Sequence, residues 1–353
     1  MKYRALWLNA DNHLVVIDQR ALPFKHEEIV IKSVDQCVNA ITNMSIRGAG
    51  IIGNTAAFGV YMAAKESKGE IGTFIKLCDK IEHSRPTAVN LSYAVDKLKT
   101  VVLDTDFDLE TIFKSAIELC AKDANDSLLI GKHGADKIEH IMKTRGLKEV
   151  SILTHCNAGY LAIVDNGTAL APIYELHRRG IKVKVYVDET RPRNQGANLT
   201  AWELAQEGID HTIIADNTGG HLMQSKDVDL CIVGADRVSL NGDTANKIGT
   251  YLKALSAKDN DLPFFIALPT STFDFASQSG DDIPIEIRDA EELRFISGID
   301  KQKIIRTIQI YPETSPALNY SFDITPARLI TAFITDRGLC KAEDIKSLFK
   351  DLL

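Results

Sequence analysis

The chain has 353 residues, of which 45% are hydrophobic and 25% are charged, and its formal net charge is −7. This composition is typical of a globular protein, and the length is sufficient for about two domains. The negative charge disfavours a nucleic-acid surface. No run of about 18 apolar residues offers a membrane span, and the first residues lack the pattern of a signal peptide. We therefore expect a cytoplasmic enzyme without nucleic-acid or membrane partners.

The first part of the chain, residues 1–146, is predicted to form a β-hairpin followed by helices. Apolar residues at 5–8 and 14–17 flank a polar turn, as in a hairpin. Ser33 and Gln36 have the spacing of a capping box, and apolar residues follow at helical spacing. Further helices are predicted over residues 55–65, 71–83, 88–102 and 109–130.

The segment from Gly48 to Gly53 matches the dinucleotide fingerprint G-x-G-x-x-G letter for letter. That fingerprint requires a buried strand directly before it, whereas the residues before Gly48 are predicted to be an amphipathic helix. Dinucleotide binding, and with it an oxidoreductase, is therefore disfavoured. A glycine turn that opens a helix after Arg47 suits a phosphate monoester, through backbone amides and a guanidinium. The alternative is a close contact between two helices.

The second part, residues 147–353, is predicted to be an α/β domain with a parallel sheet. Short apolar runs alternate with helical stretches, which is the pattern of parallel strands connected by helices. Because no low-complexity linker separates the two parts, we expect them to pack directly, with a cleft between them. The predicted strands cover residues 150–153, 183–187, 212–215, 230–233, 264–267 and 308–311.

Cys156 and Asp236 each follow an apolar run at the point where it gives way to small and polar residues. Side chains at the carboxyl ends of parallel strands face the crevice where such sheets bind ligands. A thiol and a carboxyl there suit acid/base or nucleophilic chemistry. The alternatives are a small core residue for Cys156, and a helix N-cap or an ion pair with Arg237 for Asp236. None of the six cysteines forms a C-x-x-C pair, so a zinc ribbon is not indicated.

Two polar segments are predicted to lie at the same edge of the sheet. Residues 188–197 follow a strand and contain Arg191, Arg193 and an amide, which suit a phosphorylated ligand, although a surface ion-pair loop is the alternative. Residues 241–249 read as a glycine turn that leads into a helix, with Lys247 near the helix start. A lysine there opposes the helix dipole unless an anion also binds.

Several motifs together resemble the methylthioribose-1-phosphate isomerase family, whose fold is shared with initiation factor 2B regulatory subunits and ribose-1,5-bisphosphate isomerases. The resemblance extends in order over nearly the whole chain. It is carried by Arg47-Gly48-Ala49, residues 85–91, Thr154 to Gly159, residues 189–197, Gly234 to Arg237, residues 242–251 and Ile324 to Ala327.

The resemblance implies a small amino-terminal β and helical domain, a Rossmann-like carboxyl-terminal domain, a homodimer, and neither a metal nor an organic cofactor. It implies that Cys156 and Asp236 are the catalytic pair. The positions that match the family's phosphate and sugar contacts are Arg47, Gly48, Ala49, Arg85, Gln195, Asn246 and Lys247. The implied reaction converts a 5-substituted ribose 1-phosphate to a ketose, and a non-catalytic regulatory subunit is the alternative.

Two residues near the predicted phosphate loop depart from the family pattern. Gly50 stands where the family usually has proline, and Asn54 stands where a small or aliphatic residue is more usual. Replacement of proline by glycine loosens the backbone at a cost of up to about 1 kcal/mol. The sequence therefore leaves related sugars open as substrates, such as a 5-deoxyribose 1-phosphate or ribose 1,5-bisphosphate.

Overall fold

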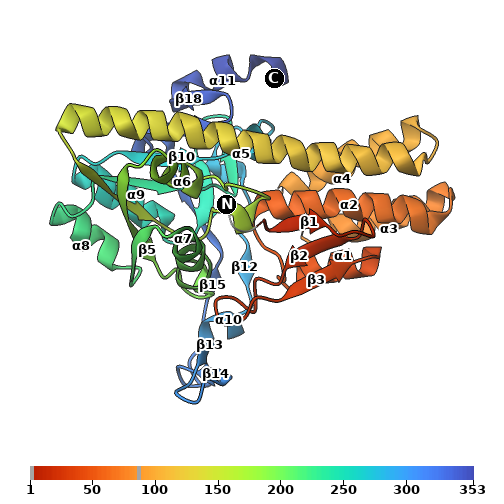
Figure 1. The fold of residues 1–353 in the computed structure, drawn as a ribbon, viewed down its shortest axis with the longest axis horizontal. Helices are drawn as coiled ribbons and strands as arrows, with labels where there is room; N and C mark the ends of the chain where they lie inside the picture. Colours follow the sequence, from red (N-terminus) through yellow and green to blue (C-terminus); the bar gives the residue numbers. More distant parts are fainter. Residues whose placement is uncertain (1–3, 86–88) are drawn as a thin grey trace.

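The computed structural model describes residues 4–85 and 89–353, and it begins with a small antiparallel sheet (Figure 1). Strand β1 (Leu6–Leu8) pairs with β2 (Leu14–Ile17), with Trp7 opposite Val15, which confirms the predicted hairpin. A third strand that the sequence did not predict, β3 (Glu28–Ile31), pairs with β2. Polar and apolar residues do not alternate along this strand, because the exposed residue Val30 is apolar.

The predicted helices of the first part are present, with shifted ends. The Ser33 hydroxyl accepts a hydrogen bond from the Gln36 amide at 3.3 Å, so the predicted cap is in place. The Gln36 side chain accepts from the Lys32 amide instead of completing the box. The predicted helix at 55 starts earlier, at Ala49. The helices are α1 (Val34–Thr42), α2 (Ala49–Ser67), α3 (Ile71–Glu82), α4 (Val89–Asp104) and α5 (Leu109–Arg145).

Helix α5 continues far beyond the predicted end at residue 130 and runs alongside both the amino-terminal helices and the parallel sheet (Figure 1). Its 37 residues span about 55 Å. Glycine usually weakens a helix interior, but at Gly134 a Cβ would lie 2.3 Å from the Pro172 ring of α6 (Leu170–Arg178). The glycine therefore allows α6 to pack closely, and α5 ends only at Gly146, with φ 69°.

The second part contains a seven-stranded sheet in the order β18-β17-β10-β7-β4-β5-β6, parallel except for β18. The α/β fold class is therefore confirmed. The domain division at residues 146 and 147 stays a prediction. The strands are β4 (Glu149–Thr154), β5 (Lys182–Asp188), β6 (Asp210–Ile214), β7 (Leu230–Val233), β10 (Phe264–Ala267), β17 (Ala332–Thr335) and β18 (Gly338–Cys340).

A strand is present near the predicted residues 308–311, but the prediction that it belongs to the parallel sheet is wrong. Residues of β14 (Ile305–Gln309) pair with β13 (Phe295–Ile299) in a hairpin that projects from the body (Figure 1). All of β14 is exposed, so its apolar residues enter no sheet core. The parallel strand beside β10 is instead β17, whose residues are all buried.

Apolar side chains of the parallel sheet alternate between two cores. Ile232 faces the core shared with α5 and α6, whereas Cys231 and Val233 face the core that includes residues of α8 (Thr218–Gln224) and α9 (Thr250–Asp259). Such burial on both faces explains why the strands read as continuous apolar runs. No helix among residues 4–85 and 89–353 is long and apolar enough to cross a bilayer.

A topological switch point lies between β4 and β7. From β4 the chain adds β5 and β6 on one side, and then returns to add β7, β10 and β17 on the other. At such a point the connections leave the sheet in opposite directions and open a crevice at the carboxyl edge. Residues that follow β4 and β7 border that crevice.

A second, four-stranded sheet lies after β7 and corrects the prediction for residues 241–249. Thr244–Lys247 form strand β9, so Lys247 ends a strand, and α9 begins at Thr250 after Gly249, with φ 102°. The strand order is β11 (Phe273–Asp274), β8 (Arg237–Ser239), β9 and β16 (Phe322–Thr325). Two short strands, β12 (Ile287–Arg288) and β15 (Asn319–Tyr320), pair nearby.

Candidate active site

A pocket of about 820 Å³ lies at the switch point, between the carboxyl edge of the parallel sheet and the start of α2. Residues from both parts of the chain line this pocket, which is partly open to solvent. All the residues that the family resemblance assigns to catalysis or substrate binding border this pocket: Arg47, Gly48, Ala49, Arg85, Cys156, Gln195, Asp236, Asn246 and Lys247.

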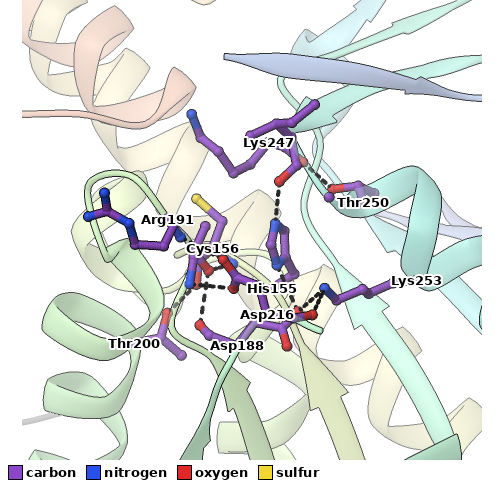
Figure 2. A network of polar contacts seen from close by, with 12 residues as sticks. His155, Cys156, Asp188, Arg191, Thr200, Asp216, Lys247, Thr250 and Lys253 are labelled. Atoms are coloured by element: carbon purple, nitrogen blue, oxygen red, sulfur yellow. Dashed lines mark hydrogen bonds and ion pairs between the residues drawn. The ribbon is translucent and has the colours of Figure 1, made fainter. Parts of the chain in front are cut away.

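Cys156 lies two residues beyond β4 in a left-handed conformation, with φ 64°. Such a backbone is unfavourable for a residue with a side chain and persists where its surroundings hold it. Here the Cys156 amide donates to Thr190 Oγ1 at 2.9 Å, and Thr200 Oγ1 donates to the Cys156 carbonyl at 2.7 Å (Figure 2). The loop therefore places the thiol in the pocket.

The environment of the thiol distinguishes Cys156 from the other cysteines. Of the six cysteines in the chain, Cys156 is the one that is not fully buried. Burial of the sulfur within the pocket nevertheless raises the pKa of the Cys156 thiol above 9.0, while Arg47 and Lys247 act in the opposite direction. The thiol is therefore protonated at neutral pH and suited to donate a proton.

Asp236 follows β7 and lines the same pocket. Burial raises the pKa of its carboxyl above 3.8, against the opposing charges of Lys247 and Arg85. The alternatives considered from the sequence are wrong. Arg237 pairs with Asp274 at 3.2 Å, and the element after Asp236 is strand β8, so there is no helix for it to cap.

Three cations border the pocket without forming a salt bridge to any described carboxylate: Arg47, Arg85 and Lys247. Arg47 is 6% exposed and Lys247 is 8% exposed. Burial lowers the pKa of Lys247 and of Arg85, because it disfavours their charged forms. A bound anion would balance this excess of buried positive charge.

Helix α2 presents its amino terminus to the same pocket. Its N-cap, Gly48, has φ 110° and provides no side-chain cap, and the first turn carries no acidic residue. A Cβ at Gly48 would lie 2.6 Å from the backbone oxygen of Ala162, so only glycine fits there. The uncapped start of a helix is suited to bind an anion. The loop that precedes it follows α1 rather than a strand, which agrees with the argument against a dinucleotide.

Several polar atoms that border the pocket are buried without a hydrogen-bond partner in the described part of the chain. They are Arg47 Nε, Gln195 Oε1 and Ser321 Oγ. Buried polar groups are nearly always paired, so orphan atoms that converge on one cavity indicate a polar ligand. The Asn246 amide donates to Thr250 Oγ1 at 3.0 Å, which orients it at the end of β9.

The sequence predicted that the two arginines of residues 188–197 contact a ligand, but both have partners within the protein. Arg193 borders the pocket but pairs with Glu292 at 3.0 Å, as the ion-pair alternative expected. Arg191 donates to the carbonyls of Pro192 and Leu293. Both side chains therefore tie this loop to the segment around α10 (Glu291–Arg294).

His155, next to the cysteine, belongs to a buried polar network beside the pocket (Figure 2). Its ring nitrogens lie 2.8 Å from Asp188 Oδ2 and 2.8 Å from the Ile248 carbonyl. Together with Asp216, His155 and Asp188 offer atoms that could ligate a metal. Lys253 Nζ, however, lies 3.0 Å from Asp188 Oδ2 and donates to the Asp216 carbonyl, and the Asp216 carboxylate accepts from the Thr190 and Arg191 amides, so both carboxylates already have partners in the protein.

The two departures from the family pattern have structural explanations. A Cβ at residue 50 would lie 2.2 Å from Ile163 Cγ1, so Gly50 makes room for Ile163 at the pocket wall. Asn54 donates to Asp123 Oδ2 of α5 at 2.6 Å and to the Gly50 carbonyl at 2.9 Å. Its side chain therefore joins two helices and does not line the pocket.

Comparison with known proteins shows the family to which the chain belongs. Residues 45–342 match the Initiation factor 2 subunit family, so the chain belongs to that family. Within it, the chain is 54% identical to methylthioribose-1-phosphate isomerase of Sulfurimonas denitrificans over 99% of each chain.

Solved structures agree with this placement. A 5-methylthioribose 1-phosphate isomerase from Pyrococcus horikoshii OT3 has a TM-score of 0.84 at 36% identity, over 99% of this chain and 96% of that one. A structure described as translation initiation factor eIF-2B subunit delta from A. fulgidus has a TM-score of 0.81 at 34% identity, over 98% and 99%.

Proposed function

We propose that the protein isomerises 5-methylthioribose 1-phosphate to 5-methylthioribulose 1-phosphate, a step of methionine salvage. The observation that carries this function is that Cys156, Asp236 and three cations meet in one pocket at the switch point, and that these cations form no salt bridge to a described carboxylate. The full-length similarity to proteins named as this isomerase supports the same reaction.

The substrate explains the residues in the pocket. A sugar whose anomeric oxygen carries phosphate has no free aldehyde, so the usual enediol route is blocked until the ring opens with the phosphate attached. Ring opening requires a proton for the ring oxygen, and the later step moves hydrogen from C2 to C1. These steps need proton donors and acceptors and a site for the phosphate.

Asp236 is the group that protonates the ring oxygen, and Cys156 is the second acid/base group. Burial raises the pKa of both side chains, which favours their protonated forms. Both follow neighbouring strands, β7 and β4, and therefore reach the same ligand.

The phosphate binds where positive groups converge. Arg47, Arg85 and Lys247 supply charge, and the uncapped start of α2 at Gly48 and Ala49 supplies backbone amides. Gln195 and Asn246 bind the sugar, for which the unpaired Gln195 Oε1 is one acceptor. Fixed charges of this kind also stabilise charge that develops in the transition state.

The resemblance further supports a homodimer in the cytoplasm. Light scattering coupled to size-exclusion chromatography measures the mass directly, and a monomer at working concentration would contradict the dimer.

An assay of the purified protein tests the reaction. We expect a ketose product from methylthioribose 1-phosphate, and 5-deoxyribose 1-phosphate and ribose 1,5-bisphosphate are the competing substrates. If only one of these two competing substrates gave a ketose, the protein would be an isomerase of that sugar phosphate instead. No ketose from any of them would favour the regulatory-subunit alternative.

A further inference from the structure

Below the pocket, Glu203 of α7 (Ala201–Glu207) is completely buried, and the proposed chemistry does not use it. Its carboxylate accepts four hydrogen bonds. The donors are Asn157 Nδ2 at 2.7 Å, the Tyr160 amide at 2.8 Å, the Leu161 amide at 3.3 Å and the Tyr174 hydroxyl at 2.8 Å. Such a set of partners fixes the position of the carboxylate.

Asn157 connects Glu203 to the pocket. Arg47 Nη2 donates to Asn157 Oδ1 at 2.6 Å and to the Asn157 carbonyl at 2.9 Å, and Nη1 donates to that carbonyl at 3.1 Å. A carboxylate only accepts hydrogen bonds and a guanidinium only donates them. Above its pKa of about 7, Glu203 is ionised and therefore turns the amide NH₂ of Asn157 toward itself and the amide oxygen toward Arg47.

The local sequence accommodates this arrangement. A Cβ at Gly159 would lie 2.0 Å from Glu203 Oε2, so the glycine of the Thr154 to Gly159 motif leaves space for the carboxylate. Thr200, three residues before Glu203, accepts from Asn157 Nδ2 at 3.2 Å and donates to the Cys156 carbonyl. The start of α7 thus supports the loop that carries the thiol.

We infer that Glu203 is a positioning residue that, through Asn157, aims the Arg47 guanidinium at the substrate phosphate. With both terminal nitrogens held by Asn157, Arg47 leaves Nε buried and unpaired within the described residues. The inference rests on the proposed function for the identity of the phosphate ester, but its core, an anion site at Arg47 that depends on Glu203, is independent of turnover.

The test is Glu203→Gln, which keeps the size of the side chain and replaces an oxygen acceptor by an NH₂ donor. Titration calorimetry with inorganic phosphate measures the anion site directly. We expect phosphate to bind roughly 10-fold more weakly, at the lower end of what loss of an outer-shell partner costs at metal sites. With the sugar phosphate, KM rises by a similar factor while kcat changes less, because the phosphate contact is present before and during the reaction.

Asp123→Asn is the matched control. Asp123 is also a buried carboxylate that accepts from an asparagine amide, but its partner Asn54 donates to the Gly50 carbonyl and forms no hydrogen bond with Arg47. We expect this variant to bind phosphate like the unmodified protein. An Arg47→Lys background gives a second control, because Glu203→Gln should cost little further affinity there.

Asn157→Ala keeps the inference testable if Glu203→Gln does not fold, and we expect the same loss of phosphate affinity. Phosphate affinity unchanged in the folded variants would overturn the inference, as would an equal loss in Asp123→Asn or no phosphate binding by the unmodified protein. If the unmodified protein produces no ketose but its phosphate affinity depends on Glu203, the proposed reaction fails and the inference stands.

Discussion

Two buried clusters of charged residues lie within a few residues of each other at the carboxyl edge of the sheet, and they differ in charge balance. In the first, His155 and Lys253 each contact the carboxylate of Asp188. In the second, Arg47 and Lys247 line the pocket without a salt bridge in the described chain. Compensated charges hold a structure together, whereas uncompensated ones are tolerated where a ligand completes them. The balance of charge, rather than the number of charged residues, distinguishes a cluster that stabilises the fold from one that binds a ligand.

The largest expected effect is on the catalytic rate, through the two acid/base residues in the pocket. Cys156→Ser and Asp236→Asn each remove one acid/base group while nearly preserving its shape. We expect kcat to fall by roughly 10²-fold to 10⁴-fold, the usual contribution of such a group. Initial rates measure the loss, and thermal unfolding shows whether stability is kept. A near-normal rate in either variant would remove that residue from the mechanism.

Paired substitutions of the two lysines test the comparison directly. Lys253→Met leaves the fully buried Asp188 without its ammonium partner, so we expect a loss of about 3–5 kcal/mol in unfolding free energy. Lys247→Met removes a cation that forms no salt bridge within the described chain, so stability should change by less than about 1 kcal/mol. Urea unfolding measures both. Equal losses would contradict the distinction between the clusters.

The pH dependence of stability reports on Glu203. Burial raises the pKa of Glu203 from 4.5 to about 7. The folded protein therefore keeps a proton on Glu203 that the unfolded chain loses, so the contribution of Glu203 to stability is greatest below pH 4.5 and is lost as the pH rises to about 7. The total change is on the order of 3 kcal/mol.

Chemical unfolding across this pH range, with Glu203→Gln as the comparison, isolates this contribution. The variant should have a flatter profile. Asp123, whose pKa burial raises to about 6, acts in the same direction and remains in both proteins. An identical slope in both would show that Glu203 does not titrate in this range.

Phosphate gives the smallest expected effect. A ligand at 100 times its Kd stabilises a protein by about 2.7 kcal/mol. We expect thermal unfolding of the unmodified protein and of Lys253→Met to shift by similar free energies when phosphate is added. In Lys247→Met the shift should be reduced. A shift that is reduced in Lys253→Met instead would place the anion at the other cluster.

Much of the fold and of the site follows from local patterns. Buried parallel strands are apolar on both faces, so most appear as apolar runs, and the polar residue at the end of each run marks the sheet edge. Local patterns located Cys156 and Asp236 and indicated Arg47 and Lys247 as anion-binding candidates, and the motif resemblance added positions such as Arg85. All of these residues border one pocket. The exposed apolar residues of β14 led to a wrong prediction, because an apolar run alone does not show whether other residues cover it.

Other features depend on distant contacts. Helix α5 continues through Gly134, where Pro172 packs against it. Lys247 lies at the end of a strand because Phe322 pairs with it across the sheet. No local sequence pattern indicates the role of Glu203, because its partner Asn157 lies far away in the chain. By itself the sequence determined which chemical groups stand at the strand ends. Tertiary structure decided which buried charges are paired and which remain open to a ligand, because that balance depends on neighbours that only folding brings together.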